Sequence, residues 1–249
     1  MKLPIPANTM WRLVGLAAGG LVFTLLVPLP GVPVADSGRA AAAIAVFGIG
    51  LVFFVQATAR RRRLRETVAF ELNKLRRIYH LGRNMAAADE RLRPWFTELH
   101  GHLLAYLSSF GGRDFARYEE SNGLFRRLSY HAYTVPGIEG GKQELLYADL
   151  LRTTGDVAEA RQRIVEARDS RLTAYGWTVF LLAVAASVLV TLESAPDRMA
   201  DRLIAGASIV LALLLVDLLW EVDSLEEERA EFPRRYADNI ARLEMRRED

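Results

Sequence analysis

The chain alternates between long apolar runs and strongly charged segments. Four runs carry almost no ionised side chain and occupy residues 13–29, 40–59, 176–192 and 203–220. A bilayer core about 30 Å thick is crossed by roughly 17 to 25 residues of helix, so each run is long enough to span a membrane. Short links join the first run to the second and the third to the fourth. The pattern therefore predicts four transmembrane helices arranged as two hairpins.

The charged segments predict how the rest of the chain is organised around these hairpins. We expect a first hairpin in residues 1–59, a helical cytoplasmic domain in 60–174, a second hairpin in 175–220 and an acidic cytoplasmic tail in 221–249. Residues 58–174 hold 21 basic and 15 acidic side chains, a net charge of +6. Basic residues that flank membrane spans stay in the cytoplasm, so both termini are expected on the cytoplasmic side of a multi-pass protein.

The central region is expected to be helical throughout. Apolar residues recur there every three or four positions, which predicts helices and gives no support for strands. One helix leaves the second span, one runs from Pro94 to about Phe110, and one covers about residues 114–133. A further helix is expected to run from about Gln143 directly into the third span. The fold class is therefore an all-α membrane protein.

Composition excludes several kinds of chemistry. The chain has 51% hydrophobic residues, 25% charged residues and a net charge of only +2, averages that resemble a soluble protein until their distribution is considered. It has no cysteine, which removes disulfides, thiolate metal sites and cysteine nucleophiles. No phosphate-binding loop, nucleophile elbow or zincin motif is present. We expect no enzyme, no bound organic cofactor and no nucleic-acid partner.

Short motifs beside the spans resemble those of the bacterial bestrophin-like membrane proteins, over about residues 40–233. After the second span the chain reads Glu71-x-x-x-Leu75-x-x-Ile78-Tyr79-x-Leu81. Before the third span it has Arg168-x-x-Arg171-Leu172, and after the fourth it has Glu221-x-Asp223. The group tends to follow its two acidic residues with Arg-Pro, whereas Ser224-Leu225 stands here. The role carried by that motif is therefore open.

The resemblance implies a function and an assembly. True bestrophins are pentameric anion channels whose second membrane helix lines the pore, so the resemblance implies a homo-oligomer, a pentamer, in the bacterial inner membrane. Its partners would be the lipid bilayer and small inorganic ions.

A pore formed by several subunits needs a helix face that is small or apolar at a constriction and basic at its mouth. The second span offers such a face in Phe47, Gly50, Phe54 and Thr58, with Phe47 or Phe54 as the candidate gate. The basic cluster of Arg60, Arg61, Arg62 and Arg63 follows and would line a vestibule or contact anionic lipid headgroups. The alternative interpretation is packing by the phenylalanines and topological anchoring by the arginines.

A second candidate site is acidic. Asp217 lies within the fourth span, where a carboxylate is costly unless it faces protein, water or a cation. Glu221 lies one helical turn later and Asp223 begins an acidic run. One interpretation is a divalent-cation site, which would supply the cation as a cofactor; the other is a charge pair near the interface followed by a solvated tail.

Two functions follow as hypotheses. The first is an oligomeric, anion-conducting channel of bestrophin-like architecture, with its pore lined by the second span. The second is a non-conducting membrane scaffold or signalling protein that docks a partner on its cytoplasmic helices. Exposed apolar patches on those helices would favour the scaffold.

Overall fold

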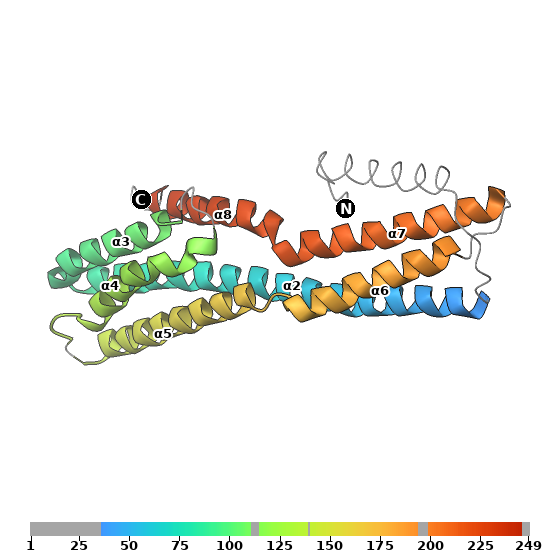
Figure 1. Cartoon of the computed structure of the whole chain (residues 1–249). Helices are drawn as coiled ribbons and strands as arrows, with labels where there is room; N and C mark the ends of the chain where they lie inside the picture. The colour runs from blue at the N-terminus through green and yellow to red at the C-terminus, as the bar shows by residue number, and fades with distance from the viewer. Residues whose placement is uncertain (1–35, 111–114, 139, 194–198, 246–249) are drawn as a thin grey trace. The chain divides into compact units, whose positions relative to one another are not determined.

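The computed structural model describes residues 36–110, 115–138, 140–193 and 199–245. Along these residues the order is α2 (Asp36–Ala88), η1 (Glu90–Leu92), α3 (Arg93–Ser108), η2 (Phe115–Ser121), α4 (Asn122–Tyr133), α5 (Lys142–Asp169), α6 (Ala174–Glu193), α7 (Met199–Ser224) and α8 (Glu226–Met245) (Figure 1). The described part of the chain contains no strand. The all-α fold predicted from the sequence is confirmed for these residues.

Three of the four predicted spans lie in helices. The second run lies in α2, the third in α6 and the fourth in α7, and these helices are long and apolar enough to cross a membrane. The first predicted run, residues 13–29, lies outside the described residues. The long α2 continues without a break from its apolar segment into the charged one.

The described residues form two compact units. The first, here called the membrane unit, comprises the described parts of Met1–Ala59 and Arg171–Ser224. The second, here called the polar unit, comprises those of Arg60–Ser170 and Leu225–Asp249. Helix α2 contributes to both units. Its side chains are mostly apolar in the membrane unit, and in the polar unit apolar side chains recur on one face of the helix.

The membrane unit buries one face of α2 against α6 and α7. Gly50 permits the closest approach, since a Cβ at this position would collide with Leu215 of α7 and lie 3.1 Å from the Phe180 ring of α6. Around it lies an apolar cluster with Phe53 packed edge-on against Phe180 at 6.1 Å between ring centroids. Its buried members are Val46, Ala57, Phe180, Val184, Ala212, Leu219 and Val222.

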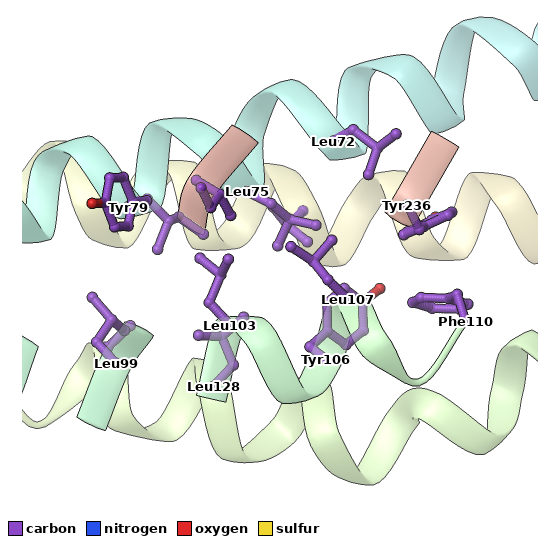
Figure 2. Close-up of a cluster of buried hydrophobic side chains, with 14 of the residues drawn as sticks. Leu72, Leu75, Tyr79, Leu99, Leu103, Tyr106, Leu107, Phe110, Leu128 and Tyr236 are labelled. Carbon is purple, nitrogen blue, oxygen red and sulfur yellow. The ribbon is translucent and has the colours of Figure 1, made fainter. Parts of the chain in front are cut away.

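The polar unit has a core contributed by α2, α3, α4, α5 and α8. Figure 2 shows Leu75 and Tyr79 of α2 on the side of the helix that faces Leu99 and Leu103 of α3, and Leu72 on the side of Leu107. The core residues of α2 recur at three- and four-residue spacing, as the sequence predicts, and include Leu64, Val68, Leu75 and Ile78 at 0% exposure. The helical periodicity of this region therefore marks the buried face.

The helix expected to run from about Gln143 directly into the third span is interrupted. It ends as α5 at Asp169, and α6 starts at Ala174. The Arg60 guanidinium donates hydrogen bonds to the carbonyl oxygens of Ala167, at 2.6 Å, and Arg168, at 2.7 Å, which have no intrahelical partner once α5 ends. The Thr173 hydroxyl then accepts the Gly176 N–H at 3.1 Å and caps α6. The prediction of a continuous helix was wrong, and the distant Arg60 side chain satisfies carbonyl groups at the end of α5.

The junction of α7 and α8 is a single residue in the left-handed region. Leu225 has φ 58° and is 2% exposed in the core of the polar unit. A non-glycine residue adopts this conformation at a cost, so burial of the leucine side chain offsets local strain.

Gly82 of α2 lies where α3 approaches closely. A Cβ there would lie 2.7 Å from Leu99 Cδ2 and 3.0 Å from Phe96 Cδ2. Because Leu99 is fully buried and cannot move aside freely, we expect Gly82→Ala to destabilise the protein by roughly 1–3 kcal/mol. Chemical denaturation of the full chain in detergent, followed by circular dichroism, measures the change.

Gly101→Ala is the matched control, because Gly101 is also helical and nothing lies within 4 Å of a Cβ built on it. Alanine is the better helix former, so this change is expected to stabilise by about 0.5–1 kcal/mol. Equal effects of the two substitutions would contradict the close approach of α3 to Gly82.

Candidate functional site

Two of the four predicted pore residues of α2 are packed inside the membrane unit, and the other two are exposed. Gly50 is buried against Leu215 and Phe180 inside the membrane unit, and Phe54 is half-buried against the same apolar cluster. Phe47 is 43% exposed and Thr58 is exposed. Within one chain, the structure therefore separates Phe47 and Thr58 from Gly50 and Phe54.

Two of the four arginines in the predicted vestibule cluster make contacts with other helices of the polar unit, and two are exposed. Arg60 is buried and bonds to the end of α5, as described above. Arg61 pairs with Glu227 and Glu228 at the start of α8. Arg62 pairs with Glu66 one turn away at 2.7 Å, with 80% of its side chain exposed, and Arg63 is exposed. Arg62 and Arg63 are thus the members of the predicted vestibule cluster that face solvent.

The predicted acidic site does not gather its carboxylates around a shared point. Asp223 is 6% exposed and accepts hydrogen bonds from the Leu172 N–H, at 3.2 Å, and the Trp177 indole N–H, at 3.3 Å. Asp217 and Glu221 are half-buried on α7. In the described part of the chain, no group of three or more acidic or histidine side chains is placed to hold a metal ion. Asp223 instead fixes the chain that enters α6.

A buried carboxylate surrounded by tyrosines is the most distinctive polar feature of the polar unit. Glu71 of α2 is 0% exposed. Its Oε1 accepts hydrogen bonds from the hydroxyls of Tyr106, on α3, and Tyr118, on η2, the latter at 2.9 Å. Its Oε2 accepts the hydroxyl of Tyr236, on α8, at 2.6 Å. One carboxylate thereby joins four elements of the unit.

Arg161 of α5 supplies the positive charge. Its guanidinium donates to the Tyr106 hydroxyl and lies 4.0 Å from Glu71 Oε1. It also donates to Ser121 Oγ at 3.0 Å and to Asn122 Oδ1 at 2.5 Å. The guanidinium carbon of Arg161, Cζ, lies 4.7 Å from the centre of the Tyr118 ring and at similar distances from the centres of the Tyr106 and Phe125 rings. The charge is thus shared between hydroxyls, an amide and aromatic faces.

Burial sets the protonation behaviour of this carboxylate centre, defined as Glu71, Tyr106, Tyr118, Tyr236 and Arg161. Desolvation raises the pKa of Glu71, while the hydrogen bonds from its three tyrosines and the charge of Arg161 oppose the rise. Desolvation and then the Glu71 charge hold the pKa of all three tyrosine hydroxyls well above their usual value. The hydroxyls therefore remain donors.

Sequence reasoning did not single out this centre as a site. Glu71 entered only as part of a resemblance motif, although a signal was present: Glu71 falls on the α2 face that carries Val68 and Leu75. A carboxylate on a buried helix face requires partners. Its hydrogen-bond partners lie 35, 47 and 165 residues away along the chain, so spacing alone could not identify them.

Comparison with known proteins addresses the fold. No protein-family model matches the sequence, and no curated protein matches it. The structure is similar to a crystal structure of a membrane protein, with a TM-score of 0.65 and 10% sequence identity, over 94% of this chain and 99% of the other. The chain has the fold of a helical membrane protein. At this identity, the likeness establishes the fold of this chain but not its function. The long apolar helices of this chain are α2, α6 and α7.

The carboxylate centre predicts unequal effects of two nearby arginines on α5. Removing Arg161 leaves the buried Glu71 charge without its cation, so Arg161→Met is expected to destabilise the membrane protein by about 3–5 kcal/mol. Arg163→Met removes only an exposed pair with Glu159 and is expected to cost about 0–1 kcal/mol. Chemical denaturation of the full chain compares the two.

Adding Glu71→Gln to Arg161→Met removes the unpaired charge. The double variant is therefore expected to lose less stability than the two single losses combined. Additive losses, or equal effects of Arg161→Met and Arg163→Met, would contradict the coupling between Glu71 and Arg161.

Proposed function

We propose that the protein is an oligomeric membrane channel in which α2 lines the conduction path. The observation that carries the proposal is the exposed side of α2. Phe47, Leu51, Val55, Thr58 and Arg62 follow one another at four, four, three and four residues, which places them along one helix face. All five are exposed in the single chain. The face changes from apolar to hydroxyl-bearing to basic within one continuous helix.

This order of side chains suits an anion path. A narrow apolar ring can gate a pore by losing its water, and a basic ring at the pore mouth concentrates anions. If several copies turn this face toward a common axis, Phe47 forms the constriction and Arg62 the mouth. The opposite side of α2 is occupied by α6 and α7, so each copy can present the exposed face while retaining its own packing.

The proposal includes the placement of the protein. Both termini and the polar unit are assigned to the cytoplasm of a bacterium, with the spans in its inner membrane, because the basic residues follow the second span directly. A pentamer is assigned from the bestrophin-like motifs, and small inorganic anions are the transported species. The likeness of fold to a membrane protein supports the membrane setting of this proposal.

A second candidate is a non-conducting scaffold or signalling protein. It is favoured by apolar side chains left exposed on the polar unit, where Tyr130 is 71%, Tyr133 52% and Leu145 72% exposed. Tyr130 and Tyr133 end α4, and Leu145 lies in the first turn of α5. Such exposed apolar side chains fit contact with a protein partner, a role that requires no ion conduction.

Reconstitution into planar bilayers tests the channel. We expect currents that reverse near the anion equilibrium potential and that increase when Phe47→Ala widens the apolar constriction. Val52→Ala is the matched control, because Val52 is also exposed on α2, at 54%, but lies one position off the proposed face. Its currents are expected to equal those of the unmodified protein.

Purified protein that remains monomeric and electrically silent across voltage, pH and divalent-cation concentration would reject the channel. Currents that respond equally to Phe47→Ala and Val52→Ala would keep a channel but reject Phe47 as its constriction.

A further inference from the structure

One buried acid joins the start of α6 to the end of α7 in the membrane unit. Asp223, near the end of α7, accepts hydrogen bonds from the Leu172 N–H at 3.2 Å and from the Trp177 indole N–H at 3.3 Å. The Trp177 ring in turn meets the Trp220 ring edge-on, at 5.6 Å between centroids. These contacts hold the start of α6 and the end of α7 at one level of the unit.

Helix α2 passes the same level in its apolar segment. A Cβ built on Gly176 of α6 would lie 3.7 Å from Phe53 Cζ of α2. Phe53 lies about two turns before the apolar run ends at Ala59. The apolar sequences of α2, α6 and α7 therefore each have one end near this level.

Large amphipathic side chains are exposed at this level. Tyr175, in the first turn of α6, is 79% exposed, and Trp220 of α7 is 58% exposed. Arg171, which precedes α6, is also exposed. Trp177, by contrast, is half-buried with its indole N–H bonded to Asp223. Two aromatic rings and one guanidinium are thus available to an external partner.

An aromatic ring that carries one polar atom suits the boundary between hydrocarbon and water. The ring is withdrawn from water there, while the indole N–H or the phenol hydroxyl remains beside lipid ester and phosphate oxygens. A guanidinium pairs with the same phosphate groups through several N–H donors. The exposed side chains therefore match the headgroup layer of a bilayer rather than its apolar core.

We propose that Arg171, Tyr175 and Trp220 form a contact surface for the phosphate-bearing headgroups of bilayer lipids. This surface, here called the headgroup belt, defines the depth at which the membrane unit leaves the hydrocarbon core. It requires no ion conduction, so it is independent of the proposed channel. Its partner is the bilayer and not a second copy of the chain.

The lengths of the helices agree with this depth. α6 has 20 residues and rises about 30 Å from Ala174 to Glu193, which equals the thickness of a bilayer core. The part of α7 from Met199 to Trp220 also rises about 30 Å. With one boundary of the hydrocarbon core at the headgroup belt, each helix is just long enough to reach the other boundary.

The headgroup belt also accounts for the acid within the fourth span. Asp217 lies three residues before Trp220, about 5 Å along the axis of α7. An ionised side chain is costly at the centre of a bilayer, and its cost falls where headgroups and water are within reach. The belt places Asp217 beside the interface, where a carboxylate is tolerated without a bound cation.

Fluorine NMR of the full chain in lipid nanodiscs tests the depth of Trp220. The four tryptophans are labelled as 5-fluorotryptophan, and each resonance is assigned by replacing that tryptophan with phenylalanine. Relaxation of each resonance is measured with a spin label on the lipid headgroup and, in a separate sample, with a spin label near the end of the acyl chain. Paramagnetic relaxation falls steeply with distance, so the ratio of the two effects reports depth.

The headgroup label is expected to relax Trp220 more strongly than the acyl-chain label by a factor on the order of ten, because the midplane of the core lies about 15 Å deeper. Tyr175→Trp adds a resonance that is expected to show the same preference. Trp95 is the internal control, since it is 5% exposed in the core of the polar unit and is expected to respond weakly to both labels.

Two results would overturn the headgroup belt. Stronger relaxation of Trp220 by the acyl-chain label would place the ring in the hydrocarbon core. Weak relaxation of Trp220 by both labels would show that protein, such as a second copy of the chain, covers it.

Thermal unfolding in nanodiscs tests the guanidinium separately. Arg171→Gln is expected to lower the unfolding temperature by about 2–4 °C more in anionic phosphatidylglycerol than in zwitterionic phosphatidylcholine. Arg163→Gln is the matched control, since Arg163 is an exposed arginine of the polar unit paired with Glu159, and equal shifts in the two lipids are expected. Equal shifts for Arg171→Gln would remove Arg171 from the headgroup belt.

Discussion

The polar unit depends on the burial of one carboxylate. Glu71 lies on the apolar face of α2, where it is withdrawn from water, and it is tolerated because three tyrosine hydroxyls and the nearby Arg161 replace the lost hydration. These partners come from α3, η2, α5 and α8. Each of these four elements must therefore bring one defined polar group to one point, which restricts its register far more than leucine packing alone would.

Much of the architecture follows from the linear pattern of side chains. Runs of apolar residues predicted the helices that contain residues 40–59, 176–192 and 203–220, and the spacing of Leu64, Val68 and Leu75 predicted the buried face of α2. Local periodicity suffices here because the cost of exposing apolar surface acts at each position separately.

Features that depend on contacts between distant residues escaped prediction. The interruption between α5 and α6 is accompanied by hydrogen bonds from Arg60, which reaches carbonyl groups more than a hundred residues later in the chain. Glu71 could be recognised as an acid on an apolar face, but its three tyrosines could not be chosen from the sequence. Similarly, the burial of Gly50 and the exposure of Phe47 on one helix depend on where α6 and α7 pack.

Infrared titration of the Glu71 carboxyl tests the central claim most directly. The band of the protonated group is isolated as the difference between the full chain and its Glu71→Gln variant, recorded in lipid over a range of pH. Burial among Tyr106, Tyr118 and Tyr236 predicts that this band persists to a pH above the ordinary titration of glutamate. A Glu71 band that disappears at the ordinary glutamate pKa would contradict the buried carboxylate centre.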